Sequence, residues 1–553
     1  MTIKKYLFLI TTYISCLAQE NNNFIKMPKT IYKNDLSLQV RKNWHLLDIE
    51  KDTLAGTSLV RAYNEIIKNK NGKEIIVAVI DTDIDIYHED LKQAIWVNKK
   101  EIPDNGKDDD HNGYIDDING WNFLGNSNGE SVSYCNTTPI RILRRLKNKH
   151  KQYPLKFDGN KKDSLLYVKT KQQFDKDLKD LELIKQYATT NLENYRDGIK
   201  KLKEKYKKEN YTIDEIDQLY YKCKKENSPL TNEVLSLRNL IRLGKNYQEL
   251  LNDSIKAEEK FKISYNENYN DRLLIGDDDT NLKDRFYGNN NVFKNAKWTY
   301  HGTIVSGVIV ANRANKIGIE GFNDNIKLMP ILAVPYGGYE NEKDINLAIH
   351  YAVDNGAKVI NMSFGNTTGD HSDWIKEAFL YAQKHDVLLI AGSGNDSSDN
   401  DTKPFYPIDY DESTGKEYCN NFIKVGAITM DGDKYFLAYF TNYGKKTVDL
   451  FAPGYFLKTT DPIVGYSYRD GTSMAGPIVA GVAALVRSYY PKLTASQVKQ
   501  ILLDSSVKFD LDVQVPGEKE GTLKPFSELS KSGGVVNAYN ALLMAKKISS
   551  KKR

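Results

Sequence analysis

The feature that most restricts the fold of this chain is a series of short segments in which nearly every residue is apolar. They lie at residues 75–80, 328–334, 357–361, 387–391, 422–428 and 448–451. Helical patterns alternate with several of them, at residues 342–355, 373–384, 475–489 and 494–503. Strands that are apolar on both faces are typical of a parallel sheet covered by helices on both sides. The sequence therefore predicts an α/β fold of three layers with a mostly parallel central sheet.

Three residues that can act as nucleophile, base and orienting acid stand at the ends of apolar elements. Asp81 ends the first apolar segment, His301 precedes an apolar helix, and Ser473 precedes another. A serine hydroxyl becomes a good nucleophile only when a base removes its proton, and N–H groups at a helix start can hold the oxyanion that follows. The chain order Asp, His, Ser is one of those in which a catalytic triad recurs.

Four sequence blocks carry a family resemblance. They read Val77–Asp85, His301–Gly307, Ala391–Asn395 and Gly471–Pro477, and with smaller motifs they cover residues 70–125 and 285–505. In these blocks the chain resembles the subtilisin-like serine proteases (the subtilases, peptidase S8). The resemblance implies a three-layer α/β fold with the active site at the C-terminal ends of the strands, and a serine-type endopeptidase activity.

The resemblance also implies a role for each residue of the site. Ser473 would attack the peptide carbonyl to give an acyl-enzyme, His301 would carry the proton, and Asp81 would orient and stabilise the imidazole. Asn395 would donate a side-chain hydrogen bond to the oxyanion, beside the backbone N–H of the nucleophile.

Two further segments resemble the walls of the substrate site. Ser363, Phe364 and Gly365 would pair with substrate backbone as an added strand. Gly392, Ser393 and Gly394 would line the opposite wall of the first specificity pocket. We therefore expect polypeptide substrates and no nucleic-acid partner.

One position departs from the family pattern. Asp83 stands where the family usually has glycine. Asp tolerates left-handed backbone conformations better than most residues, so the turn can form. We expect its charge to raise the pKa of His301.

An acidic loop has the spacing of a Ca²⁺ site. Oxygen-bearing side chains recur alternately, Gly113 permits a sharp turn, and the twelfth position is Asn119 rather than a bidentate Glu. The alternative is a hydrated acidic turn without metal. The expected ligands are Asp108, Asp110, Asn112, the Tyr114 carbonyl and Asp116.

The spacing between Asp81 and His301 indicates an insertion. The two residues are 220 positions apart, and residues 139–280 are rich in Lys, Glu, Leu and Tyr with helical spacing. We expect an inserted α-helical subdomain of three or four helices, with Gly198 among the residues that separate them. Residues 141–270 hold 30 Lys and Arg against 20 Asp and Glu, so this stretch carries +10 and the rest of the chain −5. The insertion either contacts a partner protein or an anionic surface, or is a solvent-facing addition.

The remaining boundaries follow from the two ends of the chain. Residues 1–18 read as a cleaved export signal, because the apolar stretch is shorter than the roughly 20 residues of a membrane span. This predicts a secreted or periplasmic protein, with lipid attachment at Cys16 as the alternative. The other expected segments are an N-terminal arm (19–70), the two parts of the catalytic domain (71–138 and 281–545) and a basic tail (546–553).

Two other functions are compatible with the same motifs. A processing protease of narrow specificity would use the insertion to select one partner protein. A catalytically silent scaffold would bind peptides without cleaving them, although such a protein has no need of all four residues Asp81, His301, Asn395 and Ser473.

Overall fold

Consecutive apolar residues form the strands of a nine-stranded sheet in the computed structural model, which describes residues 25, 42–68, 70–151, 157, 160–242, 245–294 and 300–551. The sheet order is β10-β13-β7-β6-β5-β4-β1-β3-β2, and every neighbouring pair except β10–β13 is parallel. The strands are β1 (Ile75–Asp81), β2 (Trp121–Asn122), β3 (Ile326–Leu332), β4 (Val359–Met362), β5 (Leu388–Gly392), β6 (Phe422–Ile428), β7 (Leu450–Pro453), β10 (Val507–Lys508) and β13 (Gly534–Val535). The predicted mostly parallel sheet is confirmed.

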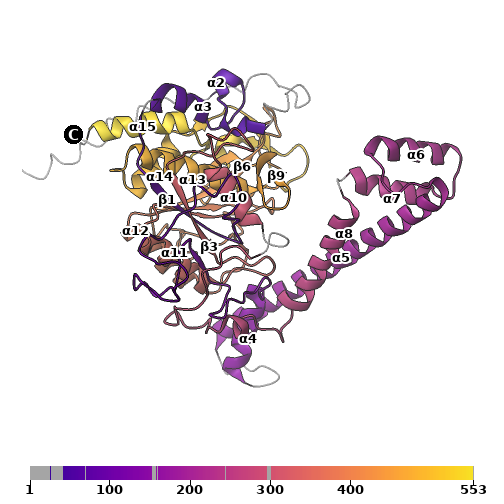
Figure 1. Cartoon of the computed structure of the whole chain (residues 1–553), viewed down its shortest axis with the longest axis horizontal. Helices are drawn as coiled ribbons and strands as arrows, with labels where there is room; N and C mark the ends of the chain where they lie inside the picture. Colours follow the sequence, from indigo (N-terminus) through magenta and orange to yellow (C-terminus); the bar gives the residue numbers. More distant parts are fainter. Residues whose placement is uncertain are drawn as a thin grey trace, which may run out of the picture.

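Alternation along each strand divides the core into two layers of side chains. In β1, Val77 and Val79 belong to one buried cluster, whereas Ala78 and Ile80 belong to the other. Successive side chains of a strand point to opposite faces, so a strand that is apolar throughout needs helices on both. Helices α10 (His301–Val310), α13 (Thr472–Tyr489), α14 (Ala495–Asp504) and α15 (Ala538–Ser550) cover the first face, and α11 (Glu342–Asp354) and α12 (Ser372–Lys384) cover the second (Figure 1).

Short elements complete the body. They are η2 (Trp44–Leu46), α2 (Ile49–Asp52), α3 (Leu59–Ala62), the π-helix η3 (Tyr63–Ile67), two hairpins, β8 (Leu457–Asp461) with β9 (Gly465–Arg469) and β11 (Asp512–Gln514) with β12 (Leu523–Pro525), and η5 (Phe526–Glu528). The N-terminal elements pack on the body, because Trp44 is fully buried and the backbone N–H of Ala538 donates to Thr57 O at 2.8 Å. The proposed export signal, Cys16 and residues 552–553 lie outside the described residues. In the described part of the chain, no helix combines the length and the apolar character needed to cross a membrane.

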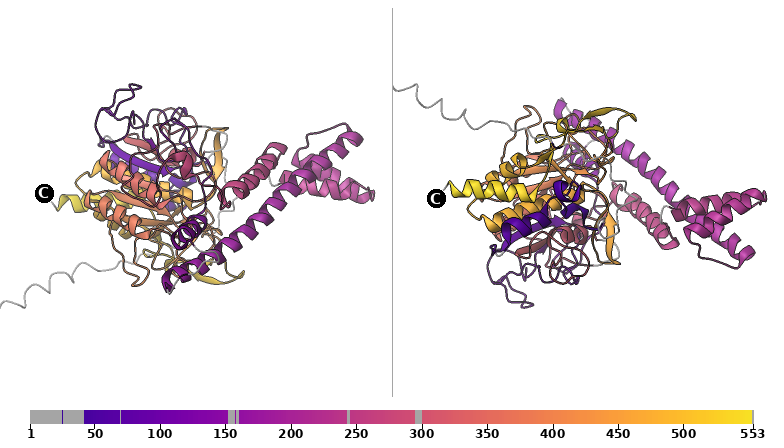
Figure 2. Two further views of the ribbon diagram at one scale, coloured as in Figure 1. Left: turned by 90° about the horizontal axis from the view of Figure 1, so that it is seen from below. Right: turned by 90° about the horizontal axis from the view of Figure 1, so that it is seen from above.

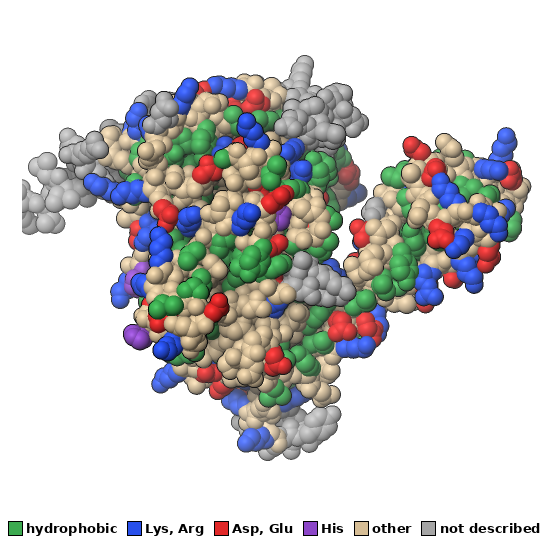
Figure 3. Space-filling model, viewed as in Figure 1, with side chains coloured by type: hydrophobic (Ala, Val, Ile, Leu, Met, Phe, Trp, Pro, Cys, Tyr) green, Lys and Arg blue, Asp and Glu red, His purple; other side chains and the backbone are tan. Residues whose placement is uncertain are grey.

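The segment inserted between Asp81 and His301 forms a long arm that projects from the body (Figures 1 and 2). Its longest helix, α5, has 46 residues, and α7 and α8 pack along it. Lys, Arg, Asp and Glu side chains are interspersed over the face of the arm seen in Figure 3. The helices are α4 (Thr138–His150), α5 (Lys161–Tyr206), α6 (Ile213–Lys225), α7 (Thr231–Arg242), α8 (Tyr247–Glu259), the π-helix η4 (Lys260–Ser264) and α9 (Arg272–Ile275).

The expectation that Gly198 separates two helices was wrong. Gly198 lies inside α5, and a Cβ placed on it would stand 2.7 Å from Leu237 Cδ1 of α7. The missing side chain therefore allows two helices to approach closely instead of marking a turn. Helix α5 therefore continues through Gly198 without a break, and the insertion as a whole has more helices than the three or four expected.

A buried ionic network fixes the end of the insertion to the body. Arg272 makes a bidentate ion pair with Asp344 of α11, at 2.9 and 2.6 Å, and Lys343 Nζ lies 2.8 Å from Asp277 Oδ2. These four side chains are at most 4% exposed. Removing one partner of such a pair leaves a buried charge without compensation, so the network holds the base of the arm in one position.

Candidate active site

The end of β1 and the start of α10 bring a carboxylate and an imidazole together. His301 Nδ1 lies 2.7 Å from Asp81 Oδ1, and the Asp81 side chain is fully buried whereas that of His301 is 37% exposed. The backbone N–H of Thr82 also donates to Asp81 Oδ1, at 2.7 Å, and Thr82 Oγ1 accepts from Gly302 N at 2.9 Å. The carboxylate thus engages Nδ1 and fixes the orientation of the ring.

The pKa of His301 is raised above its usual value. Burial by itself lowers the pKa, but the charge of Asp81 and its hydrogen bond to the ring outweigh that effect, while the positive charge of Arg469 on β9 opposes them. An imidazole that is more basic than usual is a better proton acceptor at mildly alkaline pH.

Ser473 is the second residue of α13. Gly471, two residues before Ser473, has a φ of +136°, a backbone conformation that residues with a side chain rarely adopt. The hydrogen bond that Ser473 Oγ makes within the described residues is to Ser363 O, at 3.3 Å. The Ser473 hydroxyl is therefore bonded to the backbone of the segment that carries Ser363.

Asn395 is held in place by the residue before Ser473. Its Oδ1 accepts hydrogen bonds from Thr472 N at 2.9 Å and from Thr472 Oγ1 at 3.1 Å. Because the carbonyl end of the amide is engaged, Nδ2 remains as a donor next to the cavity that Asn395 and Ser473 line together. The sequence motifs did not indicate this part played by Thr472.

The cavity beside Ser473 has a volume of about 170 Å³. Ser363, Phe364, Gly365, Gly392 and Gly394 line it, as expected from the sequence. Ser393 does not, because its buried hydroxyl donates to Asn442 O at 2.8 Å and its side chain points into the protein.

Phe405 is a lining residue that the sequence reading missed. Its ring lies between the two glycine walls: a Cβ on Gly365 would stand 2.5 Å from one ring atom, and a Cβ on Gly394 would stand 3.0 Å from others. Lys424 Nζ donates to Phe405 O and, at 2.7 Å, to Pro407 O, which fixes the backbone behind the ring. The ring therefore shortens the cavity. Its position directly before the Tyr406-Pro407 motif was the available signal.

Asp83 is placed differently from our expectation. It is fully buried, its φ is not left-handed, and its Oδ2 accepts from Lys294 N at 2.9 Å. The groups that shift the pKa of His301 are Asp81 and Arg469. The expected effect of the Asp83 charge on His301 therefore finds no support.

The acidic loop gathers only part of the expected ligand set. Asp108 accepts from Asn112 N at 3.0 Å and Gly113 N at 2.8 Å, and Asn112 Oδ1 accepts from Tyr114 N at 2.8 Å. These bonds wrap the loop around the carboxylate of Asp108. Asp116 points away, because its carboxylate accepts from Asn105 N and Gly106 N at 3.2 and 2.8 Å.

Glu101 lies beside the acidic loop and belongs to its cluster of carboxylates, although the spacing of the loop residues did not indicate this. One carboxylate oxygen each of Glu101, Asp108 and Asp110 lie within 4.8 Å of one another. Glu101 is 6% exposed, and its Oε2 is buried with no hydrogen-bond partner among the described residues, whereas Oε1 accepts from Asp110 N at 3.0 Å. A buried carboxylate oxygen without a donor is costly unless a cation compensates it.

Three known proteases are similar to this chain, and residues 72–527 match the model of the subtilase family, Peptidase_S8. The chain is 38% identical over 189 residues to the thermophilic serine proteinase of Bacillus sp. (strain AK1), covering 34% of this chain and 42% of that protein. It is 32% identical over 241 residues to the cell wall-associated protease of Bacillus subtilis (strain 168), covering 44% and 25%. It is 35% identical over 203 residues to subtilisin DY of Bacillus licheniformis, covering 36% and 68%. The chain thus spans less than half the length of the first two.

Proposed function

Because this chain belongs to the subtilase family of serine proteases, we propose that it is an exported endopeptidase with Asp81, His301 and Ser473 as its catalytic triad. The observation that carries the proposal is the 2.7 Å contact between His301 and a fully buried Asp81, in a chain whose Ser473 and Asn395 line one cavity. Asp81 and His301, which are 220 positions apart in the sequence, are in contact, and we infer that Ser473 lies close enough to His301 to complete the triad.

The proposed reaction proceeds through an acyl-enzyme. His301 Nε2 takes the proton of Ser473 as Oγ attacks the peptide carbonyl, and Asp81 stabilises the imidazolium that forms. The same proton passes to the leaving amine when the C–N bond breaks. A water molecule then attacks the ester with His301 again as base, which releases the acid and restores the hydroxyl.

Asn395 and the start of α13 supply the oxyanion site in this proposal. The Asn395 amide, held by Thr472, directs Nδ2 toward the cavity, and the backbone N–H of Ser473 lies in the first turn of the helix. Donors fixed before the reaction stabilise the developing charge without reorganisation.

Substrate recognition would use the two walls of the cavity. The segment Ser363–Gly365 would pair with extended peptide backbone, and Phe405 would restrict the side chain that enters between Gly365 and Gly394. We expect small side chains at this position.

The test compares the protein with its Ser473→Ala variant on a diverse peptide mixture, with cuts mapped by mass spectrometry. Broad cleavage that depends on Ser473 supports a degradative endopeptidase, and a few related cuts support the processing protease. Identical patterns from the two proteins would leave only the scaffold. A fluorophosphonate probe should label the protein and not the variant.

One observation favours the narrow-specificity alternative. Lys256 of α8 lies 4.8 Å from the ring of Tyr336 and 6.0 Å from that of Tyr300, the residue before His301. The base of the arm therefore stands beside the catalytic cleft. Exposed Leu183, Ile184 and Tyr187 on α5 offer an apolar contact for a partner protein. Removing the arm should broaden the cleavage pattern if this alternative holds.

Export is part of the proposal on sequence grounds. Residues 1–18 have the composition of a signal peptide, and one relative is named a cell wall-associated protease. The mass and first residue of the protein recovered from cells and medium would test it. A lipid-modified Cys16 at the N-terminus would identify the anchored form instead.

We also propose a structural Ca²⁺ site in the acidic loop, with Glu101 in place of Asp116. Asp108, Asp110 and Glu101 are oxygen donors of the kind that Ca²⁺ prefers, and the unpartnered Oε2 of Glu101 fits a cation. Asn112 and the Tyr114 carbonyl, on the same loop, are the further expected donors. The ion would tie the loop together and take no part in peptide hydrolysis.

A further inference from the structure

A second and larger cavity adjoins the one that contains Ser473. Its volume is about 380 Å³, and Phe364 lines both cavities. Phe364 belongs to the segment that we propose to pair with substrate backbone. A peptide that runs along this segment therefore passes from one cavity to the other.

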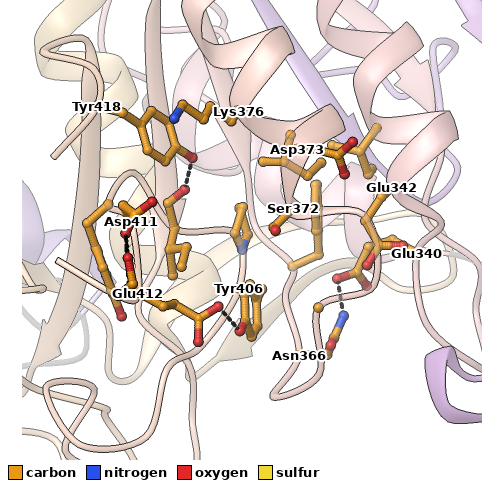
Figure 4. Close-up of a pocket in the computed structure, with 18 residues that line it drawn as sticks. Glu340, Glu342, Asn366, Ser372, Asp373, Lys376, Tyr406, Asp411, Glu412 and Tyr418 are labelled. Atoms are coloured by element: carbon orange, nitrogen blue, oxygen red, sulfur yellow. Dashed lines mark hydrogen bonds between the residues drawn. The ribbon is translucent and has the colours of Figure 1, made fainter. Parts of the chain in front are cut away.

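Five carboxylic acids line this cavity, which we call the acidic pocket. Figure 4 shows Asp373 and the two buried glutamates on one side and the remaining pair of acids on the other. Lys376 is the one cationic side chain among the described lining residues. The five acids are Glu340, Glu342, Asp373, Asp411 and Glu412.

The two glutamates are almost completely buried, each 8% exposed. Glu340 Oε1 accepts from Asn366 Nδ2 at 2.7 Å, and Glu342 Oε1 accepts from the backbone N–H of Asp370 at 2.9 Å. Within the described chain, no hydrogen bond from another residue reaches the second oxygen of either. Arg141 of α4 is 3.7 Å from Glu342 Oε2, too far for a hydrogen bond. The second oxygen of Glu342 thus has only Arg141 as a longer-range ion-pair partner, and that of Glu340 receives no hydrogen bond from another described residue.

The charge of these glutamates is incompletely compensated. Burial, with a smaller contribution from the charge of Asp370, raises the pKa of Glu342 to about 7, although Arg141 acts in the opposite direction. Burial also raises the pKa of Glu340. A cation that enters the pocket would favour the ionised form of both groups and relieve this cost.

Much of the remaining lining is apolar, although Asn366, Ser372 and Ser413 also contribute to it. Ile345, Phe364, Ile375 and Ile408 face the cavity together with the ring of Tyr418. Side chains of Arg and Lys combine an aliphatic stem with a charged head, and they pack the stem on apolar surface while the head reaches polar partners. The acidic pocket has both kinds of surface.

We propose that the acidic pocket binds an Arg or Lys side chain of the substrate, a few residues from the cleaved bond. This inference rests on the proposed protease function. It assigns to the enzyme a preference for peptides with a basic residue at one fixed distance from the scissile bond, in addition to the small residue that Phe405 admits. A bidentate guanidinium can meet two carboxylate oxygens at once, so Arg is favoured over Lys.

The experiment uses pairs of fluorogenic peptides that carry arginine or its uncharged isostere citrulline at one position. The position is moved through the four residues on each side of a fixed cleavage site. At one position kcat/KM should be about 10-fold or more higher for arginine, the size of a charge-assisted contact. The Glu340→Gln/Glu342→Gln variant should lose most of that ratio. A Glu182→Gln/Glu193→Gln variant, with the same charge change on exposed positions of α5, should keep it.

The outcomes separate the two proposals. If neither peptide is hydrolysed in a Ser473-dependent way, the protease function itself fails. If hydrolysis occurs at equal rates for arginine and citrulline at every position, only the acidic pocket is overturned, and the same holds if the glutamine variant keeps the full ratio. Should the buried double variant not fold, Asp373→Asn/Asp411→Asn removes two exposed carboxylates, and an unreduced ratio there would count against the pocket.

Discussion

Thr472 fixes the orientation of Asn395, because both its backbone N–H and its hydroxyl donate to Asn395 Oδ1. The same hydroxyl accepts from Gly394 N at 3.2 Å. One side chain thus connects the loop after β5 with the start of α13. The amide that we propose as an oxyanion donor depends on this connection for its position.

Replacing Asn395 by Ala should reduce kcat by about 10²- to 10³-fold, a loss of about 2.7–4 kcal/mol. This magnitude is the one known for the equivalent donor in subtilisin, and we carry it over to this relative. Thr472→Val should cost less, about 10-fold, because it removes one of two hydrogen bonds to the amide. Steady-state kinetics on one peptide checks both values. Thr472→Ser keeps the hydroxyl and is the control; equal losses in Ser and Val variants would contradict the role of the hydroxyl.

The pH dependence of activity should follow the titration of His301. The protonated ring accepts no proton from Ser473, so kcat/KM should fall as the pH drops through the raised pKa of His301. Arg469→Gln removes a positive charge that lowers this pKa, so the acid limb should move to higher pH. Arg469→Lys keeps the charge and should leave the profile in place. An acid limb that moves to lower pH in the Gln variant would contradict the assignment.

Phe405→Ala should change which substrates are cleaved. Shortening the ring opens the cavity between Gly365 and Gly394, so kcat/KM for peptides with Leu or Phe at that position should rise about 10- to 100-fold relative to Ala. Phe405→Leu should give an intermediate change. Kinetics on peptides that differ only at the residue before the cleaved bond provide the measurement, and an unchanged ranking would exclude Phe405 as the limiting side chain.

Asp344→Asn should destabilise the protein strongly. The substitution leaves Arg272 buried without its bidentate partner, which costs about 3–5 kcal/mol. Urea unfolding of the two proteins gives the difference. Lys171→Ala, which removes one side of an exposed ion pair with Asp175 on α5, should change stability by less than about 1 kcal/mol. Similar losses of unfolding free energy in the two variants would show that the buried network stabilises the protein no more than an exposed ion pair does.

Calcium should stabilise the protein through Glu101. At a Ca²⁺ concentration of 100 times Kd, the added stability is about 2.7 kcal/mol, visible as a higher Tm that a chelator reverses. Glu101→Gln should weaken Ca²⁺ binding measured by calorimetry. Asp116→Asn should leave it nearly unchanged, because Asp116 bonds to backbone N–H groups outside the cluster. A larger loss of Ca²⁺ binding in Asp116→Asn than in Glu101→Gln would instead support Asp116 as a ligand, as the spacing predicted.

Local sequence patterns were sufficient for the six longer strands of the sheet and for the contact between Asp81 and His301, whereas the short strands β2, β10 and β13 were not predicted. Strand β6 begins and ends where its apolar segment does, at Phe422 and Ile428. Because the strand is buried on both faces, the apolar segment and the strand have the same length. Asp81 and His301 were identifiable because strand and helix ends place them predictably. These inferences need only neighbouring residues.

Other features depend on contacts between distant residues, which spacing does not encode. Glu101 precedes the acidic loop in the sequence, and it joins Asp108 and Asp110 only because the chain folds back on itself. Glycine is typical of turns, and only the close approach of Leu237 explains why Gly198 lies inside a helix. In the sequence, Phe405 cannot be distinguished from an aromatic residue of the core. Only the structure shows that its ring lies between Gly365 and Gly394.

The arm leaves and rejoins the body at one place. Asn136, before α4, and Asp271, before α9, are joined by a hydrogen bond of 2.9 Å between the Asn136 N–H and the Asp271 carboxylate. More than a hundred residues lie between these two points, and ion pairs of Arg145 and Arg272 with the body reinforce the same junction. The catalytic body and the arm are in this sense separable modules: either can change its length or surface over evolution while the hydrogen bonds around Ser473 stay as they are.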